Sequence, residues 1–229
     1  MIISSDTIDI LKNYAEINQS LLFKQGSVLK TINEQTNVLA KVTLSESFPN
    51  DFAIYDLNKF LGVLSLFYDP QLEFKQNSVV IQASRDGNNY VVGDQIAEYQ
   101  FANKSLFEEE EKILAKDINL PSIDAQFELQ EKYLSQLMRA AAVMSLPEIA
   151  VLSDGNKMSI RAIDSKSSID SFSVDLGTSS TEFKMIFKIE NIKLMKGSYT
   201  VQLSNQGLGH FSHLHKSLEY WIATETSPQ

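Results

Sequence analysis

The sequence predicts an α+β protein made of two tandem copies of one module, each with antiparallel sheets and two helices. One order of elements, helix, strands, short helix and strands, is found twice along the chain. A turn glycine in the first half, Gly26, recurs 129 positions later as Gly155. In both halves a strand runs directly into the short helix, in "AIYDLNKFLGVLSLF" (53–67) and in "MIFKIENIKLM" (185–195). Repetition of whole elements in order indicates duplication of a module.

Length and composition agree with two domains of ordinary size. The chain has 229 residues, of which 43% are hydrophobic and 21% are charged, so two sizeable cores can form. It contains no cysteine, which excludes disulfides and zinc–thiolate sites and fits a reducing compartment. We see neither a secretory signal nor an apolar run of 18 residues, so we expect no membrane association. The net charge of −9 should repel nucleic acid unless positive charge is gathered in one place.

The first module begins with a helix predicted over residues 4–18, where apolar side chains recur on one face and Ser5 is a plausible N-cap. Two short apolar runs follow, "SLLF" and "SVLKTI", and the "KQG" between them predicts a hairpin turn at Gly26. The next runs, "NVLAKVTL" and "DFAIY", are rich in strand-forming residues. This half of the module is therefore a helix followed by four strands.

A short amphipathic helix comes next, with Asp56 as its cap. Its apolar stripe comprises Leu57, Phe60, Leu61, Leu64 and Phe67. Three further strands are predicted in "LEFK", "SVVIQAS" and "NYVVG", separated by turn-forming residues. These strands complete a first domain over residues 1–97.

Residues 98–122 interrupt the alternating pattern and are predicted to form an acidic interdomain linker. Between positions 98 and 117 there are six acidic residues against three lysines, and four of the acids are the consecutive Glu108–Glu111. A run of like charges with few strand-forming residues is typical of a solvated segment. The second domain then spans residues 123–229.

The second module repeats the first. A helix is predicted over residues 129–144, followed by a hairpin whose turn is at Gly155 and by two alternating strands. The segment "ENIKLMK" (190–196) predicts a short helix that stops at Gly197. Two more strands close the chain.

Two such modules leave unpaired strands at the ends of their sheets, and closure into a ring would pair these edges between neighbouring modules. Summed over the four predicted helices the charge is zero, so the whole net charge of −9 lies outside them. Helices that line the hole of a ring could therefore make weak, sequence-independent contacts with phosphates. Taken singly, each helix lysine is an ordinary solvated side chain.

The stretches "DTIDILKNYAEINQSLLFKQG" and "FAIYDLNKFLGVLSLF" resemble the DNA polymerase sliding clamps of T4-type bacteriophages. The resemblance implies two tandem processivity-clamp domains, assembled as a closed homotrimeric ring around duplex DNA, in the cytoplasm of an infected bacterium. It also implies an ATP-driven clamp loader, a replicative DNA polymerase that binds through its C-terminal tail, and late-transcription factors as partners.

The resemblance further implies three groups of site residues. The DNA-facing cations are Lys12, Lys59, Lys132, Arg139, Lys193 and Lys196. The pocket for partner peptides comprises Ile32, Val38, Leu106, Phe107, Tyr220 and Ile222. The edges that pair between subunits comprise Tyr90, Val91 and Val92 in the first domain and Met158 and Ile160, on a strand extending to Arg161, in the second.

We find no catalytic constellation and expect no cofactor, no metal and no enzymatic activity. The cluster "HFSHLH", with His210, His213 and His215, has metal-ligand character, but strand or loop histidines are its simpler interpretation. The segment 164–175 has Lys166 and Ile169 where a calcium loop needs an acid and a glycine. Nucleotide-binding glycine motifs and the G-x-S-x-G nucleophile motif are absent.

Two alternatives remain open from the sequence. A two-domain structural or virion assembly protein would use the duplication for packing and would show no dependence on DNA. A hydrolase using the histidine cluster would show turnover that a chelator abolishes.

Overall fold

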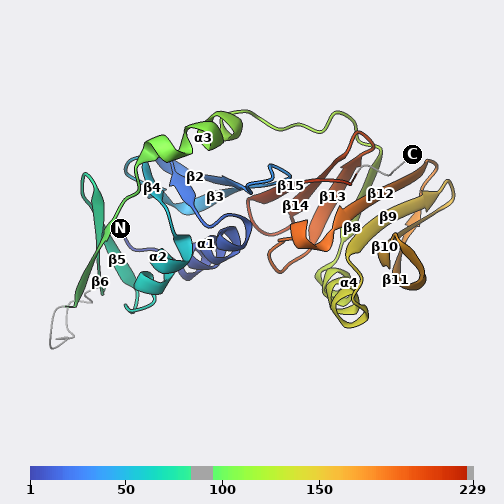
Figure 1. Ribbon diagram of the computed structural model, residues 1–229, viewed down its shortest axis with the longest axis horizontal. Helices are drawn as coiled ribbons and strands as arrows, with labels where there is room; N and C mark the ends of the chain where they lie inside the picture. The colour runs from blue at the N-terminus through green and yellow to red at the C-terminus, as the bar shows by residue number, and fades with distance from the viewer. Residues whose placement is uncertain (84–94, 226–229) are drawn as a thin grey trace. The chain divides into compact units, whose positions relative to one another are not determined.

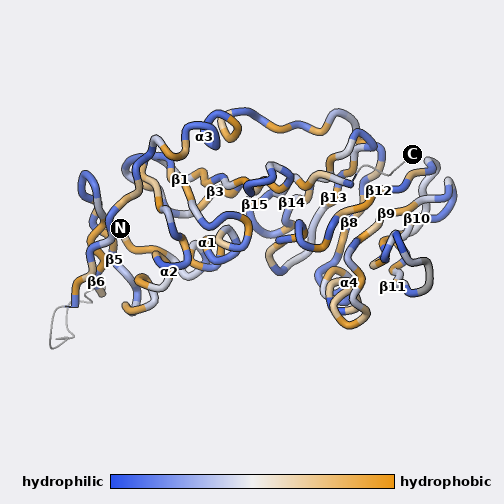
Figure 2. Tube along the Cα trace, viewed as in Figure 1, coloured by the Kyte–Doolittle hydropathy of each residue, from blue (hydrophilic) through white to orange (hydrophobic). Residues whose placement is uncertain are grey.

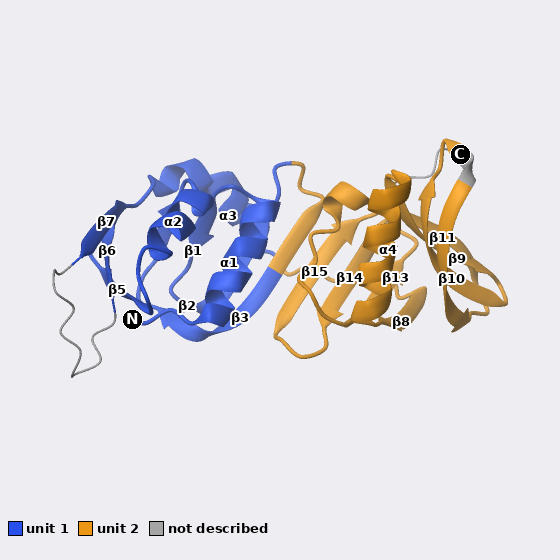
Figure 3. Cartoon of the chain, turned by 90° about the horizontal axis from the view of Figure 1, so that it is seen from below, with its two compact units in different colours: residues 1–34, 41–116 blue, residues 35–40, 117–229 orange. Residues whose placement is uncertain are grey.

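The computed structural model describes residues 1–83 and 95–225, which fold as two compact units. The first unit comprises residues 1–34 and 41–116, and the second comprises residues 35–40 and 117–229 (Figure 3). Within the described residues, no helix is long and apolar enough to cross a membrane.

Two of the helices of unit 1, α1 and α2, pack side by side (Figure 1). The first helix, α1 (Ser5–Ile17), is capped by Ser4, whose hydroxyl accepts the backbone N–H of Thr7 at 3.2 Å; the cap is one residue earlier than predicted. The second, α2 (Leu57–Leu64), is capped by Asp56 as predicted, with the Lys59 N–H donating to Asp56 Oδ1 at 2.9 Å. The predicted stripe of α2 is buried over Leu57, Phe60, Leu61 and Leu64.

Seven strands belong wholly or mainly to unit 1. They are β1 (Leu21–Phe23), β2 (Gly26–Ile32), β3 (Val38–Phe48), β4 (Phe52–Ile54), β5 (Pro70–Phe74), β6 (Ser78–Ala83) and β7 (Ile96–Gln100). The hairpin predicted at Gly26 is wrong, because β1 pairs with β4 and β2 pairs with β3. Stacked and edge-on phenylalanine rings, among them Phe23, Phe48 and Phe52, hold β1, β3 and β4 together. The strand predicted in "NYVVG" lies outside the described residues.

The segment predicted as a solvated linker is largely folded onto unit 1. Residues Lys104–Phe107 form a 3₁₀ turn, and Glu108–Leu114 form helix α3. Phe107 is buried in a cluster with Leu22 and Ala53, and the Lys30 ammonium donates to the Leu114 carbonyl at 2.7 Å. The acid run forms a helix because all four glutamates occupy its first turn, where negative charge complements the helix dipole.

Unit 2 contains helix α4 (Glu131–Met144) and eight strands. The strands are β8 (Ala125–Leu129), β9 (Glu148–Asp154), β10 (Lys157–Asp164), β11 (Ser167–Thr178), β12 (Glu182–Lys188), β13 (Tyr199–Ser204), β14 (Leu208–His213) and β15 (Leu218–Ala223). One sheet has the order β11-β10-β9-β12, and the other contains β15-β14-β13-β8. The predicted hairpin turn at Gly155 is confirmed: β9 and β10 pair antiparallel, and Gly155 has φ +83°.

The short helix predicted over residues 190–196 is wrong and is replaced by a single 3₁₀ turn, Ile189–Asn191. Tertiary hydrogen bonds prevent the residues after this turn from forming a helix. The Met195 N–H donates to the Tyr220 hydroxyl at 3.2 Å, and the Tyr199 hydroxyl donates to the Met195 carbonyl at 2.6 Å. A segment this short forms few helical hydrogen bonds of its own, so tertiary contacts decide its conformation.

Alternation of apolar and polar residues along the strands builds the core of unit 2 (Figure 2). On β13, Tyr199, Val201 and Leu203 are fully buried, whereas Thr200 and Gln202 between them are half-buried. This periodicity of two fixes which face of the sheet packs inward.

The start of α1 is stabilised by a carboxylate from β3. Glu46 accepts hydrogen bonds from the Ser4 N–H at 2.5 Å, the Thr7 hydroxyl at 2.8 Å and the Ser45 hydroxyl at 2.7 Å. Partial burial raises the pKa of Glu46, but these hydrogen bonds outweigh it and lower the pKa from 4.5 to about 2. The ionised carboxylate therefore stabilises the folded state.

We expect Glu46→Ala to lower the free energy of unfolding at pH 7 by about 1–2 kcal/mol, since orphaned donors remain at the helix start. Because the folded pKa is depressed, this stabilisation is present above about pH 4.5 and is lost as the pH falls towards 2. Urea unfolding at pH 7 and pH 3 measures the difference between wild type and variant. The exposed Glu73→Ala is the control, and an equal effect of both substitutions at pH 7 would contradict the assignment.

Candidate nucleic-acid interface

Four of the six cations predicted to face DNA lie on helices. Lys12 is on α1, Lys59 is on α2, and Lys132 and Arg139 are on α4. Seven residues separate Lys132 from Arg139, so the two project from the same side of α4 about two turns apart. The helix backbones therefore fix where this positive charge is presented.

The local partners of these cations differ. The Lys12 ammonium pairs with Asp9 at 3.0 Å, and the Lys132 ammonium lies 4.5 Å from the centre of the Tyr133 ring. Among the described residues, the charged ends of Lys59 and Arg139 have no ion-pair partner. Lys59 and Arg139 are accordingly the cations most available to an anionic ligand, because exposed pairs such as Lys12–Asp9 must first be broken.

The remaining two predicted cations do not lie on a helix. Lys193 and Lys196 follow the 3₁₀ turn that replaces the expected helix. The Lys196 ammonium lies 3.4 Å from Glu131 at the start of α4, and Lys193 is half-buried. The structure therefore brings Lys196 next to α4, although by a route that the sequence analysis did not foresee.

The residues predicted to form the peptide pocket are mostly core side chains. Leu106 is 68% exposed, whereas Phe107 is buried in unit 1. The other four are all buried: Ile32, Val38, Tyr220 and Ile222. Leu106 is thus the one member of this set whose side chain is exposed to a partner, and the pocket stays a prediction.

The second-domain edge predicted to pair between subunits is on the wrong strand. Met158 and Ile160 are buried on β10, which pairs with β9 on one side and with β11 on the other. The edge strands of this sheet are β11 and β12. The first-domain residues predicted with them, Tyr90, Val91 and Val92, lie outside the described residues.

In unit 1 the three-stranded sheet has the order β5-β6-β7. The outer edge of β5 is covered by the chain start, since the Leu72 N–H donates to the Met1 carbonyl at 2.7 Å and Ile2 bridges to Gln71. Within the described part of the chain, β7 pairs only with β6. Among residues 1–83 and 95–225, its other edge therefore has no strand partner. The sequence contains a signal for strand β7, because apolar and polar residues alternate in "IAEYQ" (96–100). The acidic run after it led us to predict a linker instead.

The three histidines have structural contacts. His210 stacks on Trp221 with ring centres 4.7 Å apart, and its Nε2 lies 3.3 Å from Glu219. The His213 ring packs edge-on against Tyr199, and its Nδ1 accepts the His215 N–H at 3.0 Å. Among the described residues, no group of three potential ligands could hold a metal ion.

Comparisons with known proteins agree with this architecture. Residues 4–114 match the family model for DNA polymerase processivity factors, and residues 126–226 match the model for the C-terminal part of the gp45 sliding clamp. The sliding clamp of Vibrio phage KVP40 is 32% identical, over 98% of this chain and 99% of that protein. The sliding clamp of Enterobacteria phage T4 is 30% identical, over 98% of this chain and 97% of that protein.

Solved structures share the fold at much lower identity. PCNA from Thermococcus kodakaraensis superposes with a TM-score of 0.69 at 14% identity, covering 98% of this chain and 99% of that one. A. fulgidus PCNA, solved with the C-terminal region of FEN-1, gives 0.69 at 11% identity, covering 97% and 96%. The fold, the two family models and the phage relatives together show that the chain belongs to the sliding clamps, the processivity factors of DNA polymerases.

Proposed function

We propose that this sliding clamp closes as a homotrimer around duplex DNA and holds the replicative polymerase on its template. The observation that carries the ring is the pair of available sheet edges, β7 in unit 1 and β11 in unit 2. Pairing β7 of one subunit with β11 of the next would satisfy the backbone groups of both edges. A heterologous interface of this kind repeats head to tail until the ring closes.

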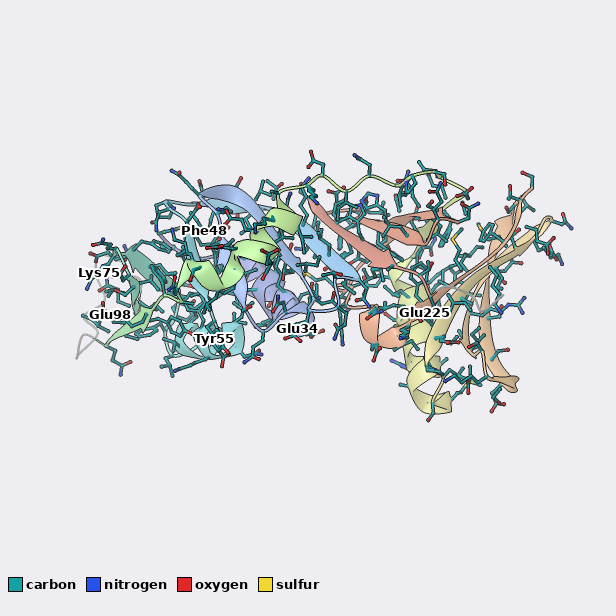
Figure 4. The ribbon with its side chains drawn as sticks, turned by 45° about the horizontal axis from the view of Figure 1, so that its top comes forward. Glu34, Phe48, Tyr55, Lys75, Glu98 and Glu225 are labelled. Atoms are coloured by element: carbon teal, nitrogen blue, oxygen red, sulfur yellow. The ribbon has the colours of Figure 1, made fainter. Side chains whose placement is uncertain are left out.

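Polar side-chain contacts order the sheet that contains β7. Lys75 and Glu98 lie side by side at this end of unit 1 (Figure 4), with the ammonium 3.7 Å from the carboxylate. The Ser78 hydroxyl donates to the same carboxylate at 2.5 Å. Both contacts join β7 to the β5–β6 hairpin and so hold β7 in its place in the sheet.

Inside the ring, α1, α2 and α4 would face the DNA. Contacts from Lys59, Lys132 and Arg139 to phosphates carry no sequence information and are individually weak, so the ring can slide. Lys12, Lys193 and Lys196 would add contacts after exchanging their present partners. Enclosure of the duplex, and not tight binding, then keeps the attached polymerase at high effective concentration.

The partners follow from the same proposal. The C-terminal tail of the polymerase would bind in the pocket that includes Leu106, as A. fulgidus PCNA binds the C-terminal region of FEN-1. An ATP-driven loader would open the ring, and late-transcription factors would use the loaded clamp, in the cytoplasm of the infected host. The clamp itself would be non-catalytic. The virion-assembly and hydrolase alternatives lose support, because the relatives are named sliding clamps.

Native mass is the first test. Sedimentation equilibrium over a range of concentrations should give about 77 kDa, three times the chain mass of 25.8 kDa. The loaded protein should then remain on circular DNA and be lost from linear DNA with free ends. A monomer at every concentration, or equal retention on circular and linear DNA, would contradict the proposal.

A further inference from the structure

Two adjoining cavities lie on the β12 side of unit 2. The first is a cavity of about 460 Å³ between residues 181–185 and the β13–β14 turn, 205–207. A second cavity of about 560 Å³ lies between residues 178–181 and the start of β8. Asp124 and Thr181 line both cavities, so the two cavities adjoin, and we refer to them together as the groove. Neither cavity includes a cation predicted to face DNA.

The backbone of β12 faces this groove with unused hydrogen-bonding groups. The Glu225 N–H donates to the Ile186 carbonyl at 2.8 Å, which shows that the groups of Ile186 point away from β9. Because the hydrogen-bonding direction alternates along a strand, those of Lys184 and Glu182 point the same way. In the described part of the chain, no backbone hydrogen bond is made to them from this side. Among residues 1–83 and 95–225, nothing therefore pairs with two successive positions of this edge.

Residue 225 already shows how a strand adds to this edge. Ile186 and Glu225 form an isolated antiparallel bridge, and the Lys188 ammonium lies 3.4 Å from the Glu225 carboxylate. Glu225, labelled in Figure 4, lines the same cavity as residues 181–185. The edge thus accepts extended backbone in antiparallel orientation.

The charge of the groove indicates what kind of segment would bind. Three carboxylates line it, those of Asp124, Glu182 and Glu225, against Lys184 in the lining and Lys188, which pairs with Glu225, so the local charge remains negative. Asp124 lies where the two cavities meet. One of its oxygens accepts the Ser122 hydroxyl at 2.6 Å and the Asn205 N–H at 2.8 Å. These bonds lower the pKa of Asp124, so a fixed negative charge stands at the middle of the groove.

We propose that the edge of β12 is a second docking site, at which an extended, basic segment of a partner protein adds an antiparallel strand and places a lysine or arginine near Asp124. Main-chain hydrogen bonds to Glu182 and Lys184 supply the affinity, and the carboxylates select a basic side chain. The site lies within unit 2 and depends neither on ring closure nor on the DNA-facing helices.

A matched pair of variants separates strand addition from simple charge attraction. Lys184→Pro and Lys184→Thr both remove the lysine, but only proline removes the outward N–H and blocks the edge. The probe is a fluorescein-labelled peptide of five Thr-Lys repeats, with five Thr-Glu repeats as the charge control. Fluorescence anisotropy with the full chain should show Lys184→Thr binding the basic peptide at least as well as wild type, and Lys184→Pro binding it about tenfold more weakly.

Further measurements on the same peptides test the proposal. Asp124→Asn should weaken binding several-fold, and backbone amides of residues 182–184 should be protected from hydrogen exchange when the basic peptide is present. Equal affinity of Lys184→Pro and Lys184→Thr would overturn the proposal, as would equal binding of the two peptides. If deletion of residues 226–229 were needed for any binding, the chain itself would be the occupant and the partner would be excluded. Unchanged thermal unfolding of Lys184→Pro would show that the variant is folded, so that its loss of binding reports the blocked edge.

Discussion

Ser173→Pro is expected to convert the proposed trimer into monomers while each chain stays folded. Ser173 lies opposite Arg161 in the β10–β11 register. The direction of the backbone hydrogen bonds alternates from strand to strand, and the strand registers carry it from Ile186 across β9 and β10 to Ser173. The N–H and C=O of Ser173 therefore point away from β10, at the outer edge of β11. Proline there removes a donor and places its ring in the path of an added strand, but it breaks no hydrogen bond made among the described residues.

The expected loss of association is at least about a hundredfold in each interface, since strand addition fails around a blocked position. Ser173→Ala is the matched control, because it keeps the N–H and should sediment as the wild type does. The same experiment on Lys184→Pro, at the other edge of this sheet, should leave the trimer intact. A trimer that survives Ser173→Pro, or one that dissociates with Lys184→Pro, would show that β11 does not close the ring.

The fold was largely predictable because it depends on patterns that are local in sequence. Asp56 and the stripe of α2 were found from a cap and a periodicity of 3.6. The hairpin at Gly155 was found from its turn residues. The hairpin predicted at Gly26 was wrong, because nothing in the sequence near β1 shows that its partner is β4, some thirty residues later. The helix predicted over residues 190–196 was wrong, because hydrogen bonds with Tyr199 and Tyr220 determine the backbone conformation of this segment.

The candidate sites were predictable only in part for the same reason. Cations on the polar sides of amphipathic helices, such as Lys59 and Arg139, could be predicted from the polar stripe of each helix. Which strand is at the edge of a sheet is a property of the whole sheet. Met158 and Ile160 lie on a strand that alternates well, and only the order β11-β10-β9-β12 shows that this strand is internal. The same order reveals the two edges on which the ring and the docking site are proposed.

Reversing two charges on α4, with Lys132→Glu and Arg139→Glu together, is expected to shorten the lifetime of the ring on DNA without changing its native mass. Each trimer would exchange six cations for six anions on the face proposed to meet the duplex. Removing a cation that meets a phosphate weakens the salt-dependent attraction, and each new glutamate repels the DNA backbone. At 0.1 M salt the screening length is about 10 Å, so charges at the helix surface still act on the duplex.

We expect polymerase processivity and retention on circular DNA to fall at least about tenfold for this variant at 0.1 M salt. The difference from wild type should shrink as the salt concentration is raised, because screening weakens both the repulsion in the variant and the attraction in the wild type. Lys157→Glu with Lys166→Glu is the matched control, since these two exposed lysines lie on β10 and the turn after it, outside every helix. If both double variants lose processivity equally, the effect follows from net charge and α4 does not face the DNA. A loss confined to the α4 variant, with the trimer mass intact, would assign this helix to the inner surface of the ring.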